Sequence, residues 1–247
     1  MKWRLSFNWV LALACAASVA DASAQRCEAR ADARPPAIVE LYTSEGCSSC
    51  PPADRWLSAL KGRQDVIALA FHVNYWDRLG WPDRFATPAI TERQHQLAQA
   101  NGSGYVYTPQ VVVNGRDLRD WRGSEPQRLP TSALTLSLQR EGRTVTAQVG
   151  PAAGRLAGRL ASRLAGYWAV LEDGHASRVR AGENAGQTLR HDHVVTAYQP
   201  VGAWTADATQ TWRLTLPAPT VGITRRVAFV VTEPGSQRPL QAVALAC

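Results

Sequence analysis

The sequence predicts an α/β domain followed by a small all-β, sandwich-like domain. Three observations lead to this expectation. Residues 37–121 alternate β-rich runs with helical segments, which is typical of an α/β unit. Residues 131–247 contain short strand-like runs separated by turn signals, as in an antiparallel β-sandwich. Between them, residues 122–130 (RGSEPQRLP) have the composition of a linker.

Residues 1–24 have the pattern of an export signal. Lys2 and Arg4 precede a short apolar run, and the segment closes on the small-residue sequence ASA, which predicts cleavage near Ala24. The run is too short for a stable membrane span, so we expect a periplasmic or secreted mature protein that begins with a polar tether, residues 25–36. Cys15 leaves lipidation as a minority alternative, because it only loosely matches a lipoprotein cleavage box.

The charge of the chain points to no particular partner. Lys and Arg number 27 against 20 Asp and Glu, a net charge of +7. The basic residues are scattered and do not form a run with interleaved aromatic residues, so we do not expect nucleic acid as a partner.

The cysteine count suggests two disulfides. Of the five cysteines, all except Cys15 remain after cleavage. An even number in an exported chain favours pairing, with Cys47 joined to Cys50 and Cys27 joined to Cys247. Alternatively, Cys247 is free or pairs with another molecule.

Cys47 and Cys50 form the Cys-x-x-Cys motif around which the chain is organised. The motif follows the β-rich run 37–43 and precedes a helical segment. Two sulfurs on a first helical turn can close a redox disulfide, and the helix dipole stabilises the first one as a thiolate. Zinc ligation is a weaker alternative, since a second ligand pair is missing and the nearest extra donors are His72 and His95. A structural disulfide without turnover is a further alternative.

Two segments near the cysteines are candidates for the same site. Glu40 could accept the proton of a buried thiol if it points beneath the cysteines; an outward-facing acid is the alternative, because strand alternation does not choose the face. The continuous apolar run 65–73 predicts a strand buried on both faces. A crowded loop follows it, and we expect the residues at this strand end to form a site wall, unless they only pack the loop: His72, Tyr75, Trp76 and Trp81.

The next segments predict a helix and a hairpin. Thr87-Pro88 indicates the start of a helix that runs to Asn101-Gly102. Thr108-Pro109 then enters a β-branched run that ends in the hairpin signal Asn114-Gly115. Proline directly before a buried strand has no amide to donate, and a cis bond between Thr108 and Pro109 would be a special feature of this turn.

The order strand, Cys-x-x-Cys, helix, strand, helix, Thr-Pro, strand, Asn-Gly resembles the thioredoxin fold over residues 37–121. The resemblance implies that Cys47 attacks, that Cys50 resolves, and that cis Pro109, preceded by Thr108, lies against them. Glu40 falls near the buried acid of that family, one residue out of register. The segments GCSSCPPAD, FHVNYWD and YTPQVVVNG resemble more closely an uncharacterised family of exported bacterial proteins with a thioredoxin-like domain.

We therefore expect a thioredoxin-like domain and an exported thiol-disulfide oxidoreductase-like enzyme. Its partners would be protein thiols or disulfides in the periplasm, and it would use no cofactor and no metal. Two alternatives remain: a redox-inert binding scaffold with structural disulfides, and a copper-binding protein with Cys47, Cys50 and His72 as ligands. The sequence does not indicate the direction of exchange, the redox potential or the partner, since the dipeptide Ser48-Ser49 departs from the commoner pairs.

Overall fold

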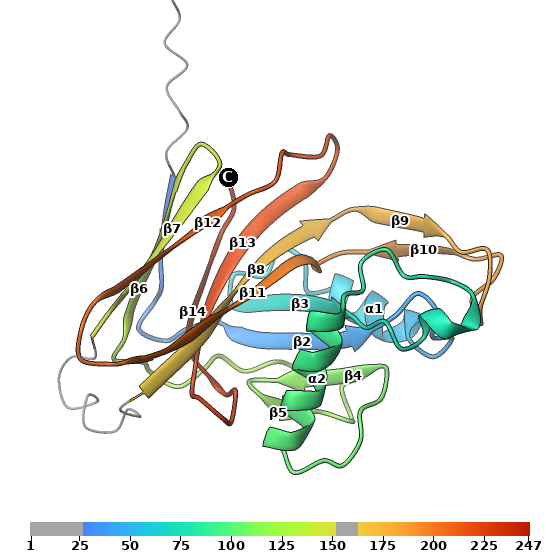
Figure 1. The fold of residues 1–247 in the computed structure, drawn as a ribbon, viewed down its shortest axis with the longest axis horizontal. Coiled ribbons are helices and arrows are strands. Elements are labelled where there is room, and N and C mark those ends of the chain that lie inside the picture. Colours follow the sequence, from blue (N-terminus) through green and yellow to red (C-terminus); the bar gives the residue numbers. More distant parts are fainter. Residues whose placement is uncertain (1–26, 152–162) are drawn as a thin grey trace, which may run out of the picture.

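The computed structural model describes residues 27–151 and 163–247 (Figure 1). The predicted export signal, its cleavage site and Cys15 lie outside the described residues. No helix in the described part of the chain is both long enough and apolar enough to cross a membrane.

An eight-stranded mixed sheet forms the centre of the molecule, in the order β14-β13-β8-β11-β3-β2-β4-β5. β2 pairs in parallel with β3 and antiparallel with β4. The strands of this sheet are β2 (Ala37–Thr43), β3 (Val66–His72), β4 (Gln110–Val113), β5 (Arg116–Asp117), β8 (Arg163–Asp173), β11 (Val194–Thr205), β13 (Thr224–Thr232) and β14 (Pro239–Leu245).

Two smaller sheets accompany it. A four-stranded antiparallel sheet has the order β1-β6-β7-β12, with β1 at Cys27–Arg30, β6 at Thr135–Glu141, β7 at Thr144–Gly150 and β12 at Gln210–Thr215. β9 (His175–Arg178) and β10 (Thr188–His191) pair only with each other among the described strands. Figure 1 shows this hairpin, called here the arm (residues 175–191), extending beyond β8 and β11 toward the first helix.

The predicted fold class, a thioredoxin-like α/β domain followed by a β domain, is wrong. The described part of the chain is mostly β and contains two α-helices, α1 (Pro51–Ser58) and α2 (Pro88–Ala100), and the short 3-10 helix η1 (Asp77–Leu79). β3 has β2 on one side and β11 on the other, where Val194 pairs in parallel with Ala70. The apolar run of β3 needs neighbours on both edges, and a strand more than a hundred residues downstream supplies one of them.

The described residues form three apolar cores on the two faces of the large sheet. On one face, a core under α2 runs from Ile38 and Phe71 to Tyr167 and Val230. The opposite face is covered at one end by the four-stranded sheet, which packs on residues such as Trp168. At the other end of that face, α1 packs on alternate residues of β2 and β3. The region around α1 is where the Cys-x-x-Cys motif lies.

Several local predictions are confirmed. α2 begins after Thr87, whose side chain accepts a hydrogen bond from Ile90 N. The Thr108–Pro109 bond is cis. Asn114 and Gly115 both have positive φ in the β4–β5 hairpin, as expected for this turn signal. β1 forms within the segment expected to be a tether, because it pairs with β6.

Candidate functional site

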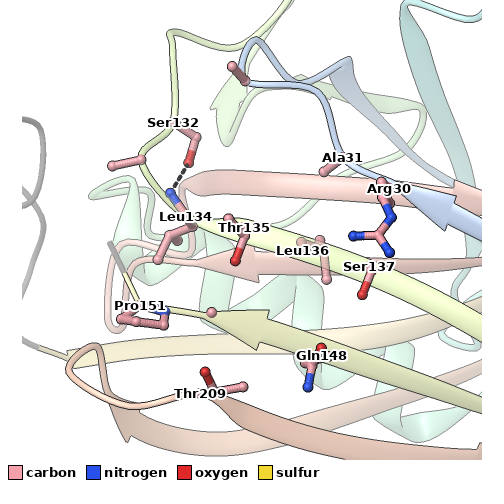
Figure 2. Close-up of a pocket in the computed structure, with 13 residues that line it drawn as sticks. Arg30, Ala31, Ser132, Leu134, Thr135, Leu136, Ser137, Gln148, Pro151 and Thr209 are labelled. Atoms are coloured by element: carbon pink, nitrogen blue, oxygen red, sulfur yellow. Dashed lines mark hydrogen bonds between the residues drawn. The ribbon is translucent and has the colours of Figure 1, made fainter. Parts of the chain in front are cut away.

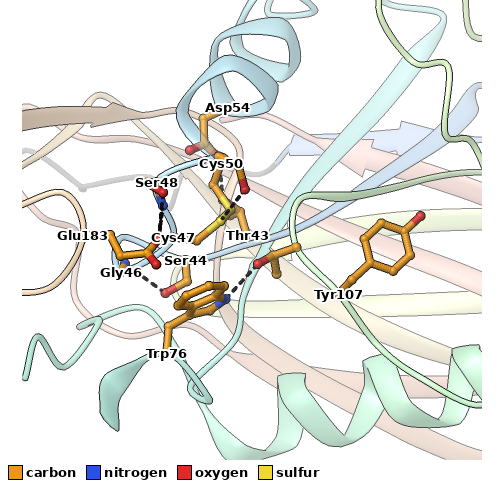
Figure 3. Close-up of a disulfide and its surroundings, with 12 residues drawn as sticks. Thr43, Ser44, Gly46, Cys47, Ser48, Cys50, Asp54, Trp76, Tyr107 and Glu183 are labelled. Atoms are coloured by element: carbon orange, nitrogen blue, oxygen red, sulfur yellow. Dashed lines mark hydrogen bonds between the residues drawn. A yellow bond between two sulfur atoms is a disulfide. The ribbon is translucent and has the colours of Figure 1, made fainter. Parts of the chain in front are cut away.

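The Cys47–Cys50 disulfide lies where β2 leads into α1 (Figure 3). The two Cα atoms are 5.4 Å apart, and Cys50 is the N-cap residue of a helix that starts at Pro51. The predicted pairing of Cys27 with Cys247 is also present. Both sulfur-bearing residues of the motif are 0% exposed, whereas Ser48 and Ser49 between them are exposed.

The segment that holds the disulfide is the cysteine loop (residues 44–50). Its first turn is closed by Cys47 N donating to Ser44 O at 3.1 Å and by Gly46 N donating to Ser44 Oγ at 3.1 Å. A Cβ atom at Gly46 would stand 3.0 Å from Trp76 Cβ. Glycine therefore permits the close approach of the Trp76 loop to the cysteine loop.

Asp54 is the acid that the structure places at the disulfide. Asp54 N donates to Cys50 O at 3.1 Å, so the carboxylate lies one helical turn after Cys50. Helical side chains lean toward the N-terminus, which directs Asp54 back toward Cys50, and Figure 3 shows the two next to each other. Thr43 Oγ1 donates to Asp54 Oδ1 at 2.8 Å. Burial raises the pKa of Asp54, and the nearby His72 and His191 oppose this only in part.

A buried cluster of ionisable side chains continues from Asp54. His72 Nδ1 lies 2.7 Å from Asp83 Oδ2, and the rings of His72 and His191 are 5.1 Å apart. Glu45 Oε1 lies 3.1 Å from His191 Nε2, and Glu45 N donates to Asp83 Oδ2 at 2.8 Å. The cluster thus fixes the start of the cysteine loop to β3 and to the arm.

The pKa values in this cluster follow from burial and pairing. Burial raises the pKa of Asp83, but His72 and the backbone amides of Glu45 and Phe85 outweigh it and lower the pKa to about 2. Burial lowers the pKa of His72, but Asp83 and the other carboxylates outweigh it, so the net pKa is raised. Among the described residues, buried His72 Nε2 has no hydrogen-bond partner. These shifts favour a charged pair in which Asp83 is ionised.

The four residues expected to form a site wall do not lie together: Trp76 contacts the cysteine loop, whereas His72 and Trp81 belong to the buried cluster. Trp76 Nε1 donates to Thr108 Oγ1 at 2.8 Å (Figure 3). Thr108 precedes cis Pro109, so this bond connects the cis-proline segment with the Trp76 loop, which contacts the cysteine loop. Trp81 Nε1 donates to Glu45 Oε2 at 2.7 Å and belongs to the buried cluster. Tyr75 packs against Trp76 and the core under α2. His72 lies beneath α1, fully buried, and does not form an outer wall.

The tip of the arm, called here the tip loop (residues 179–187), reaches the cysteine loop from the second half of the chain. Glu183 Oε2 accepts hydrogen bonds from Ser48 N at 2.9 Å and from Ser48 Oγ at 2.7 Å. Asn184 Nδ2 donates to Glu45 O at 2.9 Å and to Cys47 O at 3.0 Å. Sequence spacing did not connect Glu183, Asn184 or His191 with the cysteines, because only tertiary pairing brings the arm here.

Glu40 does not take the expected place beneath the cysteines. Its carboxylate pairs with Arg93 of α2 at 2.5 Å and accepts a hydrogen bond from Tyr167 at 2.9 Å. Glu40 shares the α2 face of β2 with Ile38, whereas Thr43 projects to the α1 face and bonds Asp54. The spacing of Asp54 four residues after Cys50 was the signal that could have identified the carboxyl group that lies beside the disulfide.

Cis Pro109, one of the expected site residues, lines a pocket of about 330 Å³ together with Tyr107 and Trp121. Across residues 27–151 and 163–247, no group of three or more His, Cys, Asp or Glu side chains is placed to hold a metal ion. A pocket of about 490 Å³ lies on the four-stranded sheet, around Arg30, Ser137, Gln148 and Thr209 (Figure 2). None of the expected site residues lines it.

The fold and site define a mostly β protein with a buried Cys-x-x-Cys disulfide at the start of a helix. The chain belongs to the family described as "Protein of unknown function (DUF1223)", whose model matches residues 38–232. The comparisons do not connect it to the thioredoxin superfamily. No curated protein matches it.

Two solved structures are similar to this chain. Protein AGR_C_4864 from Agrobacterium tumefaciens is 30% identical, with a TM-score of 0.63, and the match covers 85% of this chain and 93% of that one. HBP35 of Porphyromonas gingivalis is 15% identical, with a TM-score of 0.56, covering 87% of this chain and 76% of that one. The second likeness concerns the fold alone.

Proposed function

We propose that this protein exchanges disulfides with protein thiols through Cys47 and Cys50. The observation that carries the proposal is the disulfide at the start of α1, with a buried carboxyl group, Asp54, one helical turn away. A helix N-terminus stabilises a thiolate, and a buried acid can supply or accept the proton of its partner sulfur. The predicted export signal makes the periplasm the proposed location.

The exchange balances as follows for a partner with two thiols. A partner thiolate attacks the Cys47 sulfur, and the Cys47–Cys50 bond breaks with its electron pair on the Cys50 sulfur, which takes the proton of the Asp54 carboxyl group. The second partner thiol gives its proton to solvent and attacks the mixed disulfide, releasing Cys47 as a thiolate. The protein gains two electrons, and the partner leaves as a disulfide. The reverse sequence would reduce a disulfide of the partner and leave Cys47 and Cys50 joined again.

In this proposal, Asp54 takes the role that the sequence suggested for Glu40. Its raised pKa keeps the carboxyl group protonated to a higher pH than an exposed aspartate, which a proton donor requires. Thr43 orients the carboxyl group through its hydroxyl. Glu40 cannot share the task, because on the other face of β2 its Oε1 accepts from Arg93 and Tyr167 and its Oε2 accepts from Tyr42.

A redox-inert scaffold is the second candidate, and one observation favours it. Cys47 and Cys50 are both 0% exposed, as expected of a disulfide that only holds the cysteine loop together. In that case the disulfide would resist reduction as firmly as Cys27–Cys247. The two candidates therefore differ in the relative reducibility of two disulfides within one molecule.

The deciding experiment uses this internal reference. The mature protein is equilibrated in graded glutathione buffers, quenched with an alkylating reagent, and mapped by mass spectrometry. Reversible opening of Cys47–Cys50 between roughly −100 and −270 mV, with Cys27–Cys247 intact, would support exchange chemistry. Equal resistance of both disulfides would favour the scaffold.

A further inference from the structure

The disulfide is closed off from solvent although the residues between its cysteines are exposed. Ser48 and Ser49 lie at the surface, while Cys47 and Cys50 have no exposed area. An attacking thiolate must approach a sulfur atom directly, along the axis of the bond that breaks. Exchange therefore requires some neighbouring segment to move.

The tip loop is held to the cysteine loop by a small set of polar contacts. Buried Asn184 donates to the carbonyl groups of Glu45 and Cys47. Exposed Glu183 accepts both hydrogen bonds from Ser48, and these bonds lower its pKa. Figure 3 shows Glu183 directly beside Ser48 and Cys47. No disulfide joins the described residues of the arm to the cysteine loop, so these contacts can open reversibly.

The backbone of the tip loop is suited to such a movement. Gly182 and Gly186 flank the two contact residues, with φ of +74° and +85°. A Cβ atom at Gly186 would meet nothing within 4 Å, so this glycine turns in open space. At its base, the loop is closed by Val179 N donating to Gln187 O at 2.9 Å. The base can thus stay formed while the tip lifts.

We propose that the tip loop is a lid over the Cys47–Cys50 disulfide, latched by Glu183 and Asn184, and that it opens to admit a thiol. Opening frees Ser48 N and Oγ, which offer a hydrogen-bonding position to a carbonyl or carboxylate group of the incoming partner. The lid would keep small thiols out and make exchange depend on a partner that displaces Glu183. The purpose of the lid rests on the proposed function, and the test below separates the two.

The test measures how fast dithiothreitol opens Cys47–Cys50 in the full mature chain, with alkylation and mass spectrometry as the readout. Asn184→Ala removes two buried hydrogen bonds, and we expect reduction to become about ten- to a hundredfold faster. Glu183→Ala should give a smaller acceleration. Gln187→Ala, an exposed amide in the same loop, is the matched control and should leave the rate unchanged.

Hydrogen exchange gives a second readout that does not depend on reduction. The Ser48 amide donates a hydrogen bond to Glu183, so its hydrogen should exchange faster in Glu183→Ala. This measurement can be made even if Asn184→Ala fails to fold. A rate for Asn184→Ala within twofold of the wild type would overturn the lid, as would acceleration by Trp76→Phe alone. A faster Asn184→Ala without reversible glutathione equilibrium in the wild type would keep the lid and refute exchange. Reversible equilibrium in the wild type with an unchanged reduction rate in Asn184→Ala would support exchange and refute the lid.

Discussion

Replacing Asp83 with asparagine should destabilise the protein by about 2 to 3 kcal/mol near pH 6. The pKa of Asp83 falls from 3.8 to about 2 on folding, because His72 and two backbone amides outweigh its burial. Each unit of pKa shift corresponds to 1.36 kcal/mol of folding free energy. Asparagine loses the charge that faces His72 and has only one oxygen for the amides of Glu45 and Phe85, so the loss should be at least this linkage contribution.

The loss should depend on pH in a defined direction. Because folding lowers the pKa of Asp83, its stabilisation is fully present above about pH 4 and is lost as the pH falls through 2. Folding raises the pKa of His72, so its share is present below 6.5 and is lost as the pH rises through the folded value. The difference between wild type and variant should therefore be largest between about pH 4 and 6.5.

Urea unfolding followed by tryptophan fluorescence, from pH 2 to 8, measures this difference. Asp120→Asn, an exposed aspartate away from the cluster, is the control and should change stability little at any pH. If Asp83→Asn costs under about 0.5 kcal/mol at pH 6, or the same amount at every pH, the charged His72–Asp83 pair does not hold the cysteine loop, and our account of the cluster is wrong.

Three further predictions concern the cysteines and the two buried acids. Asp54→Asn should slow dithiothreitol reduction of Cys47–Cys50 about 10²-fold, because the proton donor is lost. It should also raise the free energy of unfolding at pH 7, because the stabilisation linked to a raised aspartate pKa is lost as the pH rises. An unchanged reduction rate would remove Asp54 from the mechanism. Cys50→Ser should accumulate mixed disulfides through Cys47 on non-reducing gels, whereas Cys47→Ser should not, and equal capture by both would contradict the assigned order. Arg93→Met should cost about 3 to 5 kcal/mol in urea unfolding, because it leaves the Glu40 carboxylate buried and unpaired, and adding Glu40→Gln should recover much of it; no recovery would mean that the pair is not coupled.

Local spacing was enough to predict the parts of the site that lie close together in sequence. The Cys47–Cys50 pair, the cis bond before Pro109 and the Asn114-Gly115 turn each depend on a few adjacent residues. The carboxyl group beside the disulfide was harder to predict, because strand alternation alone allows Glu40 to face either side of the sheet. α2 carries Arg93, and this buried cation fixes the choice.

The remaining parts could not be predicted because their contacts are far apart in sequence. Nothing in the run that forms β11 shows that it will pair with β3, since an apolar strand pairs equally well with many neighbours. The arm gave no strand signal of its own, yet it brings His191 and Asn184 to the cysteine loop. Site residues of this kind become visible only when the pairing is known.

The position of β3 in the large sheet has a consequence for cutting the protein into pieces. A fragment of residues 37–130 would lack β11 and would leave one edge of β3 with unpaired amide and carbonyl groups beside an uncovered apolar face. Such an edge is a template for aggregation. The first half of the chain should therefore be insoluble when expressed alone, and the intact protein should unfold in a single cooperative transition.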